Sequence, residues 1–345
     1  MSSDAQRFHA PELDEEILVT WPDYAVDHER IGGALADAGL RARLRPKLGA
    51  RSPGELTELA AGAAGAIVST DPFTADVLAA TPSLRVIARV GIGTDSVDLA
   101  AATAHGVVVT VTPGANEATV ADHTVAMALG ILRRLAEHDA SVRRGEWNRT
   151  GVHTPSVLSG ATVGLVGYGG IGRLVAERMA GFGVRLLVHD PVAEPDGVAE
   201  RVPLEVLLTA AQVVSLHVPL LPATKHLIGA PELALMRPDA VLVNTARGGV
   251  VDEAALVDAL EQGRLRGAAL DVFEQEPPRS RRLLALGNVL LSPHIAALSE
   301  QSVHEMTARA TASVVDVLRG RIPRDVANPD VLERAVPLST ADRDA

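Results

Sequence analysis

Short apolar runs recur through the first part of the chain and alternate with longer stretches of helical periodicity. Residues between the runs, such as 28–38 and 53–61, have the spacing of amphipathic helices. The runs themselves have the length and β-branched content of strands, and they lie at 17–21, 40–44, 66–69, 85–90 and 107–112. This alternation predicts a parallel sheet that helices cover on both faces, with right-handed crossovers.

A second series of the same kind follows Pro113-Gly114. Residues 117–135 have the apolar content of a long helix that carries the chain into a second domain, and 299–319 predicts a helix that returns to the first. Strand-like runs lie at 213–216, 241–244, 268–272 and 289–291. With the segment described next, they predict a doubly wound sheet of six or seven strands. Residues 1–13 and 333–345 show no clear periodicity.

Residues 161–190 have the order strand, glycine-rich turn, helix and strand, which is the order of a dinucleotide-binding unit. In that interpretation Gly167 allows the tight turn, Gly169 lets a pyrophosphate approach the backbone, and Gly172 lets the helix pack on the strand. The amides at the start of the helix would hold the phosphates. Asp190 ends the second strand, where a carboxylate binds the adenosine ribose and repels a 2′-phosphate. The unit therefore predicts NAD as cofactor, with NADH preferred over NADPH.

Three polar stretches follow predicted strands of the second domain and bring an arginine, a carboxylate and a histidine to one edge of the sheet. Arg247 can grip a planar carboxylate and polarise a carbonyl. His294 can move a proton near neutral pH, and a carboxylate beside it fixes the tautomer. The stretch 271–277 supplies that carboxylate, with Glu274 and Glu276 as rival candidates. With a nicotinamide present, the set suits interconversion of a 2-keto acid and a 2-hydroxy acid.

Composition narrows the class of protein. The chain has 345 residues, of which 47% are hydrophobic, so it can build two buried cores. It has no cysteine, which excludes disulfides, thiolate metal sites and a cysteine nucleophile. A net charge of −11 and 2% aromatic residues argue against nucleic-acid and anionic-membrane binding. The polar start, without a long apolar segment, leads us to expect a cytoplasmic protein, and no metal-ligand spacing is evident.

Several motifs occur in the order found in one enzyme family. They are RVGIGTDSVDLAAA at 89–102, TPGANEATVADHT at 112–124, the GYGGIG turn, LHVPLLPATKHLIG at 216–229, NTARGGVVDEAAL at 244–256, ALDVFEQEPP at 269–278 and SPHIA at 292–296. From about residue 17 to 332 the chain resembles the D-isomer-specific 2-hydroxyacid dehydrogenases. That family includes phosphoglycerate, glycerate, formate and D-lactate dehydrogenases and the C-terminal-binding-protein co-repressors.

The resemblance implies roles for particular residues. Arg247 would bind the substrate carboxylate and carbonyl, and His294 would be the acid/base. Glu276 would be its partner and is favoured over Glu274, because the family glutamate directly precedes a proline, here Pro277. Backbone amides at Ile92 and Gly93 of the first domain would hold the substrate carboxylate. The resemblance and the glycine turn together implicate the following residues in cofactor binding: Gly167, Gly169, Gly170, Ile171, Gly172, Asp190, His217, Val218, Pro219, Thr245, Ala246, Asp271 and His294. Asp271 could equally support the fold, and His123, His217 and His226 are expected to be mainly structural.

The implied fold is α/β, with two doubly wound parallel-sheet domains. A Rossmann nucleotide domain at 111–296 would be inserted into a discontinuous flavodoxin-like substrate domain made of 1–110 and 297–345. The family also implies a homodimer, formed through the long helix and an arm that carries Trp147. Two questions stay open: which 2-keto acid is the substrate, and whether the chain is instead an NADH-sensing, co-repressor-like binding protein. Phosphoglycerate is disfavoured, because phosphoglycerate enzymes carry an arginine near this stretch, whereas residues 67–71 here are Ile-Val-Ser-Thr-Asp and could repel a phosphate.

Overall fold

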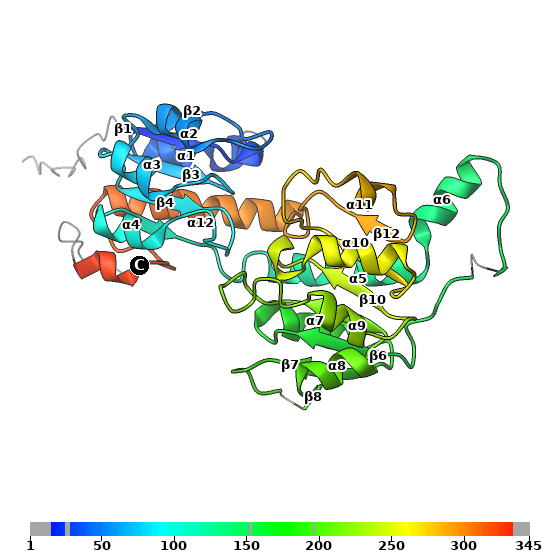
Figure 1. The fold of residues 1–345 in the computed structure, drawn as a ribbon. Helices are drawn as coiled ribbons and strands as arrows, with labels where there is room; N and C mark the ends of the chain where they lie inside the picture. Colours follow the sequence, from blue (N-terminus) through cyan, green and yellow to red (C-terminus); the bar gives the residue numbers. More distant parts are fainter. Residues whose placement is uncertain (1–14, 25–27, 152–153, 196, 334–345) are drawn as a thin grey trace, which may run out of the picture. The chain divides into compact units, whose positions relative to one another are not determined.

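The structure, a computed structural model, describes residues 15–24, 28–151, 154–195 and 197–333 (Figure 1). The two terminal segments without clear periodicity lie almost entirely outside these residues. The chain forms two compact units: unit 1 combines the chain up to residue 115 with the chain from residue 300, and unit 2 comprises 116–299. The predicted bounds at 110 and 297 fall a few residues earlier.

Unit 1 contains a five-stranded parallel sheet with the strand order β2-β1-β3-β4-β5. This is the flavodoxin-like doubly wound order, and it confirms the predicted fold class. The strands are β1 (Glu15–Val19), β2 (Leu40–Leu44), β3 (Gly65–Val68), β4 (Val86–Arg89) and β5 (Val108–Thr110). The helices are α1 (His28–Asp37), α2 (Pro53–Ala60), α3 (Ala75–Ala80), α4 (Leu99–Ala104) and α12 (Glu300–Leu318), with 3₁₀ turns at Pro22–Tyr24 and Pro329–Glu333.

Each face of this sheet has its own apolar layer. Helices α1 and α12 cover one face, where Met306 and Val314 pack with Ile17 and Val86. Helices α2, α3 and α4 cover the other, around Leu18 and other buried side chains. Because α12 contacts β3, β4 and β5, the C-terminal helix returns to the first domain as predicted.

Unit 2 contains a seven-stranded parallel sheet with the order β12-β11-β10-β9-β6-β7-β8. The strand order reverses between β6 and β9, and in doubly wound sheets a ligand binds at such a switch point, beyond the carboxyl ends of the strands. The strands are β6 (Thr162–Val166), β7 (Arg185–His189), β8 (Glu200–Arg201), β9 (Val213–Leu216), β10 (Val241–Asn244), β11 (Gly267–Leu270) and β12 (Val289–Leu291). The helices are α5 (Glu117–Leu132), α6 (Leu135–Arg143), α7 (Gly170–Ala180), α8 (Leu204–Ala210), α9 (Ala230–Leu235), α10 (Glu253–Glu261) and α11 (Arg281–Ala285), with a 3₁₀ turn at Gly248–Val250.

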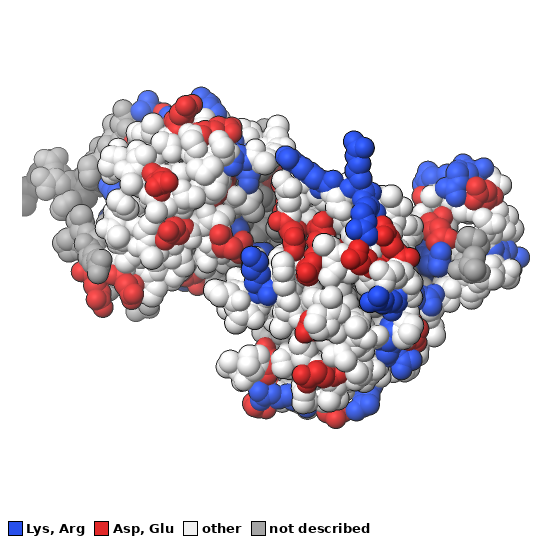
Figure 2. Space-filling view, in the orientation of Figure 1, with Lys and Arg blue, Asp and Glu red and all other residues white. Residues whose placement is uncertain are grey.

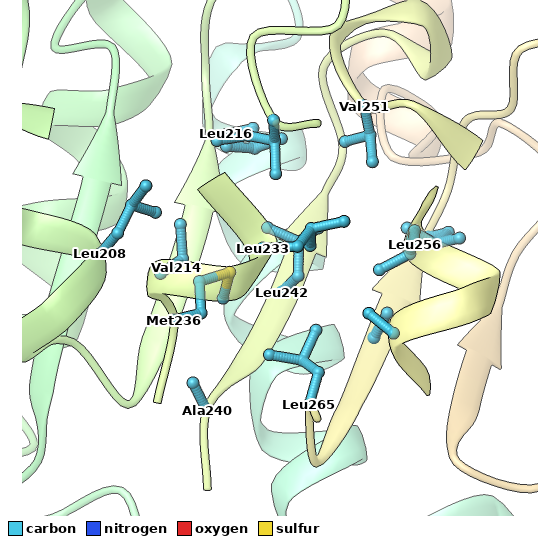
Figure 3. Close-up of a cluster of buried hydrophobic side chains, with 14 of the residues drawn as sticks. Leu208, Val214, Leu216, Leu233, Met236, Ala240, Leu242, Val251, Leu256 and Leu265 are labelled. Carbon is cyan, nitrogen blue, oxygen red and sulfur yellow. The ribbon is translucent and has the colours of Figure 1, made fainter. Parts of the chain in front are cut away.

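The central strands of unit 2 are buried along their length, as their continuous apolar sequences predict. Helices α5 and α7 share one core with one face of the sheet. Helices α8, α9 and α10 cover the other face, where Val214 and Leu242 of adjacent strands lie against Leu233 and Leu256 (Figure 3). These two layers fix where each strand ends, and therefore where the polar loops begin.

The predicted helix 117–135 is shorter in the structure. Helix α5 ends at Leu132, and α6 starts at Leu135. Arg134 between them has a φ of 52°, a left-handed conformation that an α-helix cannot continue through. The long apolar stretch is therefore two helices with a break.

Charged side chains of both signs are interspersed on the visible face of each unit (Figure 2). None of the helices within the described residues is long and apolar enough to cross a membrane.

Candidate active site

The glycine turn between β6 and α7 has the close contacts that its spacing predicts. Gly167 has a φ of +99°, and a Cβ there would lie 2.6 Å from the carbonyl oxygen of His217. A Cβ at Gly172 would overlap the carbonyl oxygen of Gly167, so helix and strand approach as closely as backbone allows. The Cβ position of Gly169 is open, with no heavy atom within 4 Å. The turn therefore fits a dinucleotide: it packs tightly on the protein side and is uncovered where a pyrophosphate would approach.

Asp190, one residue beyond β7, is held in place by backbone amides. Its Oδ2 accepts a hydrogen bond from the amide of Tyr168 at 2.8 Å, which ties it to the glycine turn. Its Oδ1 accepts hydrogen bonds from the amides of Val192 at 2.8 Å and Ala193 at 2.7 Å. Burial raises the pKa of Asp190, but these hydrogen bonds and the charge of Arg201 outweigh it, so the net pKa is lowered. The carboxylate thus stays charged at neutral pH.

Glu117 is an unexpected neighbour of the turn. A Cβ at Gly170 would overlap the Glu117 carboxylate, which therefore lies directly against the first residue of α7. Sequence reasoning missed this contact, because it depends on how α5 packs on α7. A negatively charged side chain therefore sits beside amides that are expected to hold phosphate.

The loop after β10 carries Arg247 and is braced from within. The Asn244 side chain donates to the carbonyl oxygen of Arg247 at 2.9 Å and accepts from the amide of Ala246 at 3.0 Å. Thr245 is buried, and its hydroxyl lies 2.7 Å from that of Thr124 on α5. Asn244 was not predicted as a site residue, yet its two hydrogen bonds fix the backbone on which the Arg247 guanidinium is mounted.

Gly248 allows this loop to touch the loop after β11. A Cβ at Gly248 would overlap the carbonyl group of Phe273 and crowd the amide nitrogen of Glu274. The two loops are therefore in backbone contact, directly beside Arg247 on one side and three residues before Glu276 on the other. The sequence shows a glycine here, but nothing in it identifies the partner backbone.

Glu276 and His294 form the predicted pair. His294 Nδ1 lies 2.8 Å from Glu276 Oε2, and the side chains are 34% and 37% exposed, so solvent or a ligand can reach them. The other carboxylate oxygen, Oε1, accepts from the amide of Phe273 at 3.3 Å. Glu274, the rival candidate, turns instead to His226, with Oε1 2.7 Å from Nε2.

The electrostatic surroundings keep Glu276 ionised. Partial burial acts to raise its pKa. Although burial is the largest single influence, the hydrogen bond and charge of His294, the Phe273 amide and the positive charge of Arg247 together outweigh it, so the net pKa is lowered. A carboxylate beside Nδ1 orients the ring and favours the imidazolium, as an acid/base requires.

Asp271, at the end of β11, holds the loop that carries His294. It is fully buried, and its carboxylate accepts from the Ser292 hydroxyl at 2.6 Å and the amides of Ile295 at 2.9 Å and Ala296 at 2.8 Å. The amide of His294 donates to the carbonyl oxygen of Asp271 at 2.8 Å. His294 has a φ of 56°, an uncommon conformation for a non-glycine residue, and these bonds hold it there. The structure thus gives Asp271 the supporting role that the sequence left open.

The segment after β9 lies against the glycine turn. The amide of His217 donates to the carbonyl oxygen of Val166 at 2.7 Å, and its Nε2 lies 3.0 Å from the Ser215 hydroxyl. Burial lowers the pKa of His217 to about 4, so the ring is neutral at pH 7. Val218 and Pro219 follow at the surface of the same turn. His123 on α5 is 3.1 Å from the Ser292 hydroxyl, which places it beside the His294 loop.

Unit 1 carries the predicted substrate-binding amides in the loop after β4. Ile92 is 37% exposed there, and Gly93 is half-buried. The loop is anchored where Gly91 and Thr112 exchange hydrogen bonds, from the Gly91 amide to the Thr112 hydroxyl and from the Thr112 amide to the Gly91 carbonyl, each 3.0 Å.

The segment 67–71 does not present a free negative charge, contrary to the prediction that it could repel a phosphate. Asp71 is fully buried; it accepts from the Thr20 hydroxyl at 2.6 Å and is paired with Arg51 at 2.7 Å. The prediction that this carboxylate could repel a substrate phosphate is therefore wrong, because its charge is compensated and removed from solvent. Among the described residues, no group of three or more His, Asp or Glu side chains is arranged to hold a metal ion.

The fold and this set of loops define a nucleotide-binding α/β protein of the dehydrogenase class. A family model described as the NAD binding domain of D-isomer specific 2-hydroxyacid dehydrogenases matches residues 125–296. A glyoxylate reductase of Thermococcus litoralis is 40% identical over 278 residues, which cover 78% of this chain and 84% of the relative. The chain therefore belongs to the D-isomer specific 2-hydroxyacid dehydrogenase family, as its motifs predicted.

Other relatives show how broad the family is. A D-3-phosphoglycerate dehydrogenase of Methanocaldococcus jannaschii is also 40% identical, over 74% of this chain but only 49% of its own greater length. Among solved structures, the TT0316 protein of Thermus thermophilus has a TM-score of 0.82 at 38% identity, covering 90% of this chain and 99% of that one. An NADPH-dependent glyoxylate/hydroxypyruvate reductase of Sinorhizobium meliloti, solved with NADP and malonate, has a TM-score of 0.79 at 32% identity, covering 91% and 97%.

Proposed function

We propose that this protein is an NAD-dependent enzyme that reduces a small 2-keto acid to the D-2-hydroxy acid, or oxidises it in reverse. The observation that carries the proposal is the 2.8 Å contact between His294 Nδ1 and Glu276 Oε2, on loops that follow strands of the same parallel sheet as the Arg247 loop. Membership of the family and the reductase names of its relatives support the reaction class.

Each side chain has a distinct task in the proposed reaction. The bound nicotinamide supplies or accepts the hydride at the carbonyl carbon. His294 gives a proton from Nε2 to the carbonyl oxygen, because Nδ1 is engaged by Glu276. Glu276 fixes the ring and stabilises its charged form. Arg247 binds the substrate carboxylate and offsets the negative charge that develops on the carbonyl oxygen.

The remaining substrate and cofactor contacts are part of the same proposal. The amides of Ile92 and Gly93 in unit 1 hold the substrate carboxylate. The glycine turn with Gly170 and Ile171, the segment 217–219, Thr245 and Ala246 line the dinucleotide. Asp271 acts mainly through the His294 loop. NADH is preferred over NADPH, because the Asp190 carboxylate stays charged where a 2′-phosphate would lie.

A screen of NADH oxidation against a panel of 2-keto acids tests the proposal. We expect turnover with at least one small acid and formation of the D product. Arg247→Ala should lower kcat/KM, by an amount that corresponds to a loss of about 2 to 4 kcal/mol of transition-state stabilisation. NADH binding without turnover on any acid, together with an NADH-dependent change in assembly, would instead establish the alternative, an NADH-sensing binding protein.

We also infer a homodimer formed through the arm at 135–157. Four apolar side chains there are exposed in the single chain: Leu135 at 58%, Val142 at 56%, Trp147 at 75% and Val157 at 65%. Exposed apolar groups gathered on one segment are typical of an interface. Trp147→Glu should shift the mass measured by light scattering towards that of a monomer. Leu48→Glu, which changes a residue outside the arm that is 89% exposed, should not; a monomeric wild-type protein would contradict the inference.

A further inference from the structure

We propose that His226 and Glu274, with Glu253, clamp the Arg247 loop to the Glu276 loop and act as positioning residues for the proposed reaction. The inference rests on the proposed function for its catalytic meaning, but the clamp is a structural feature with its own readout.

The short loop after β11 carries the glutamates of two histidine–glutamate pairs. Glu276 pairs with His294 at 2.8 Å, and Glu274, two residues earlier, pairs with His226 at 2.7 Å. Because only Gln275 separates the two glutamates, the position of one limits the position of the other. A displacement of Glu274 therefore also displaces Glu276, the partner of the proposed acid/base.

His226 belongs to a segment that is bound to the Arg247 loop. The amide of His226 donates to the carbonyl oxygen of Gly249 at 2.8 Å, and Ile228 continues the pairing with Val250 at 3.1 Å. His226 itself has a φ of 51°, so its side chain leaves the segment from an uncommon backbone conformation. The contact between His226 and Glu274 thus joins a segment fixed to the Arg247 loop with the loop that carries Glu276.

Glu253, the first residue of α10, closes the link from the other side. Its amide donates to Glu274 Oε1 at 3.4 Å, and the amide of Glu274 donates to Glu253 Oε2 at 3.3 Å. Burial raises the pKa of Glu253, and the charge of Glu274 raises it further against the opposing hydrogen bond from the Glu274 amide. Each of the two carboxylates accepts a hydrogen bond from the other residue's amide, and His226 Nε2 gives Glu274 a further partner.

The close contact at Gly248 makes this link sensitive to small displacements. The backbone of Gly248 already touches Phe273 and Glu274, so the two loops have no room to move closer. The clamp holds them from moving apart. Since Arg247 and Glu276 flank the contact, a shift of a few tenths of an ångström would change the distance between the guanidinium and the acid/base pair.

The pair is more than a third exposed, so its own contribution to the stability of the fold is small. Its effect should therefore appear in geometry and rate. Glu274→Gln keeps the shape of the side chain and removes the charge. His226→Asn removes the imidazole while keeping a residue that tolerates the left-handed backbone. Glu200→Gln, which breaks the exposed Arg185–Glu200 pair elsewhere in unit 2, is the matched control.

We expect Glu274→Gln and His226→Asn each to lower kcat about three- to tenfold, with the Kd for NADH unchanged. The double variant should lose no more than either single one, because both remove the same link. The pH-rate profile should shift, because the Glu276–His294 pair is less well held. Amide hydrogen exchange should speed up in 247–253 and 272–276, and Glu200→Gln should change none of these quantities.

Exchange rates and pH-rate profiles equal to those of Glu200→Gln, or losses that multiply in the double variant, would overturn the clamp. So would a loss of kcat that only follows a fall in melting temperature, since that is a purely structural effect. If the wild-type protein turned over no 2-keto acid, the proposed function would fail, while the exchange comparison would still decide whether the link exists.

Discussion

The proton that His294 is proposed to transfer depends on a single imidazole nitrogen. His294→Gln keeps a side chain of similar size but cannot carry a proton between water and substrate. We expect kcat to fall by about 100- to 10,000-fold, the range for loss of a general acid or base, while the Kd for NADH changes little. Steady-state kinetics and fluorescence titration measure the two quantities.

The pH dependence of the wild-type rate follows from Glu276. Its pKa is lowered, so the Glu276–His294 pair is complete above the ordinary pKa range of glutamate and is lost as the pH falls through the lowered value. The rate should therefore persist into mildly acidic solution before it drops. An unaltered pH-rate profile in His294→Gln would remove the acid/base assignment.

The proposed preference for NADH depends on Asp190, whose two oxygens accept three backbone hydrogen bonds. Asp190→Asn keeps an acceptor for the loop and removes the charge. The ratio of the Kd for NADPH to that for NADH should fall by about tenfold or more, because the repulsion of a 2′-phosphate is lost. Asp239→Asn, in an exposed pair with Arg237, should leave the ratio unchanged; a wild-type protein that binds NADPH as well as NADH would contradict the preference.

At this scale the sequence predicted which residue types meet, because motif residues directly follow strands whose carboxyl ends share an edge. It also favoured Glu276 over Glu274, and the structure pairs Glu276 with His294. It could not show what Glu274 does instead, since its partner His226 is distant in the chain. The contact between Glu117 and Gly170 was hidden for the same reason.

Gly248 sets the spacing between the Arg247 loop and the Glu276 loop. A methyl group there would overlap the backbone of the 273–274 segment, and backbone cannot turn aside as a flexible side chain can. Gly248→Ala should therefore separate the Arg247 loop from the Glu276 loop, destabilise unit 2 by about 1 to 3 kcal/mol, and lower kcat/KM further than that loss of folded protein explains. Gly287→Ala, at a position with open space around the Cβ, is the control. Wild-type kinetics in Gly248→Ala would show that the contact does not position the site.

Strands were easier to predict than helix ends. Continuous apolar runs identify buried parallel strands directly, and the predicted 40–44, 213–216, 241–244 and 289–291 coincide with β2, β9, β10 and β12. The break at Arg134 could not be predicted, because arginine is a good helix former and a non-glycine residue seldom adopts the left-handed conformation found there. The short helices α3, α9 and α11 likewise have too few turns for a clear periodic signal.

For the whole molecule, the two units have separate cores, and each contains one of the two tryptophans. Trp21 is 7% exposed in unit 1 and hydrogen-bonds to Thr307, so its fluorescence reports the unfolding of that unit. Trp147, in unit 2, lies in the arm inferred to form the dimer, so a Trp147→Phe background leaves Trp21 as the only tryptophan signal. Circular dichroism reports the unfolding of both units. NADH should raise the melting temperature only of the part of that transition that belongs to unit 2.

Trp21 fluorescence and circular dichroism together can show which unit loses stability as the pH falls. Burial lowers the pKa of His217 in unit 2 to about 4, so the unfolded chain binds this proton at a higher pH than the folded one. Stability from the neutral ring is fully present above the unfolded pKa and is lost as the pH falls from about 6.5 towards 4. Because His217 is half-buried, we expect a loss of about 1 to 2 kcal/mol between pH 7.5 and pH 5. His217→Gln should flatten the pH dependence of the circular dichroism transition and leave the Trp21 transition as it is. Equal pH dependence in the variant and the wild type would mean that His217 is not held neutral by the fold.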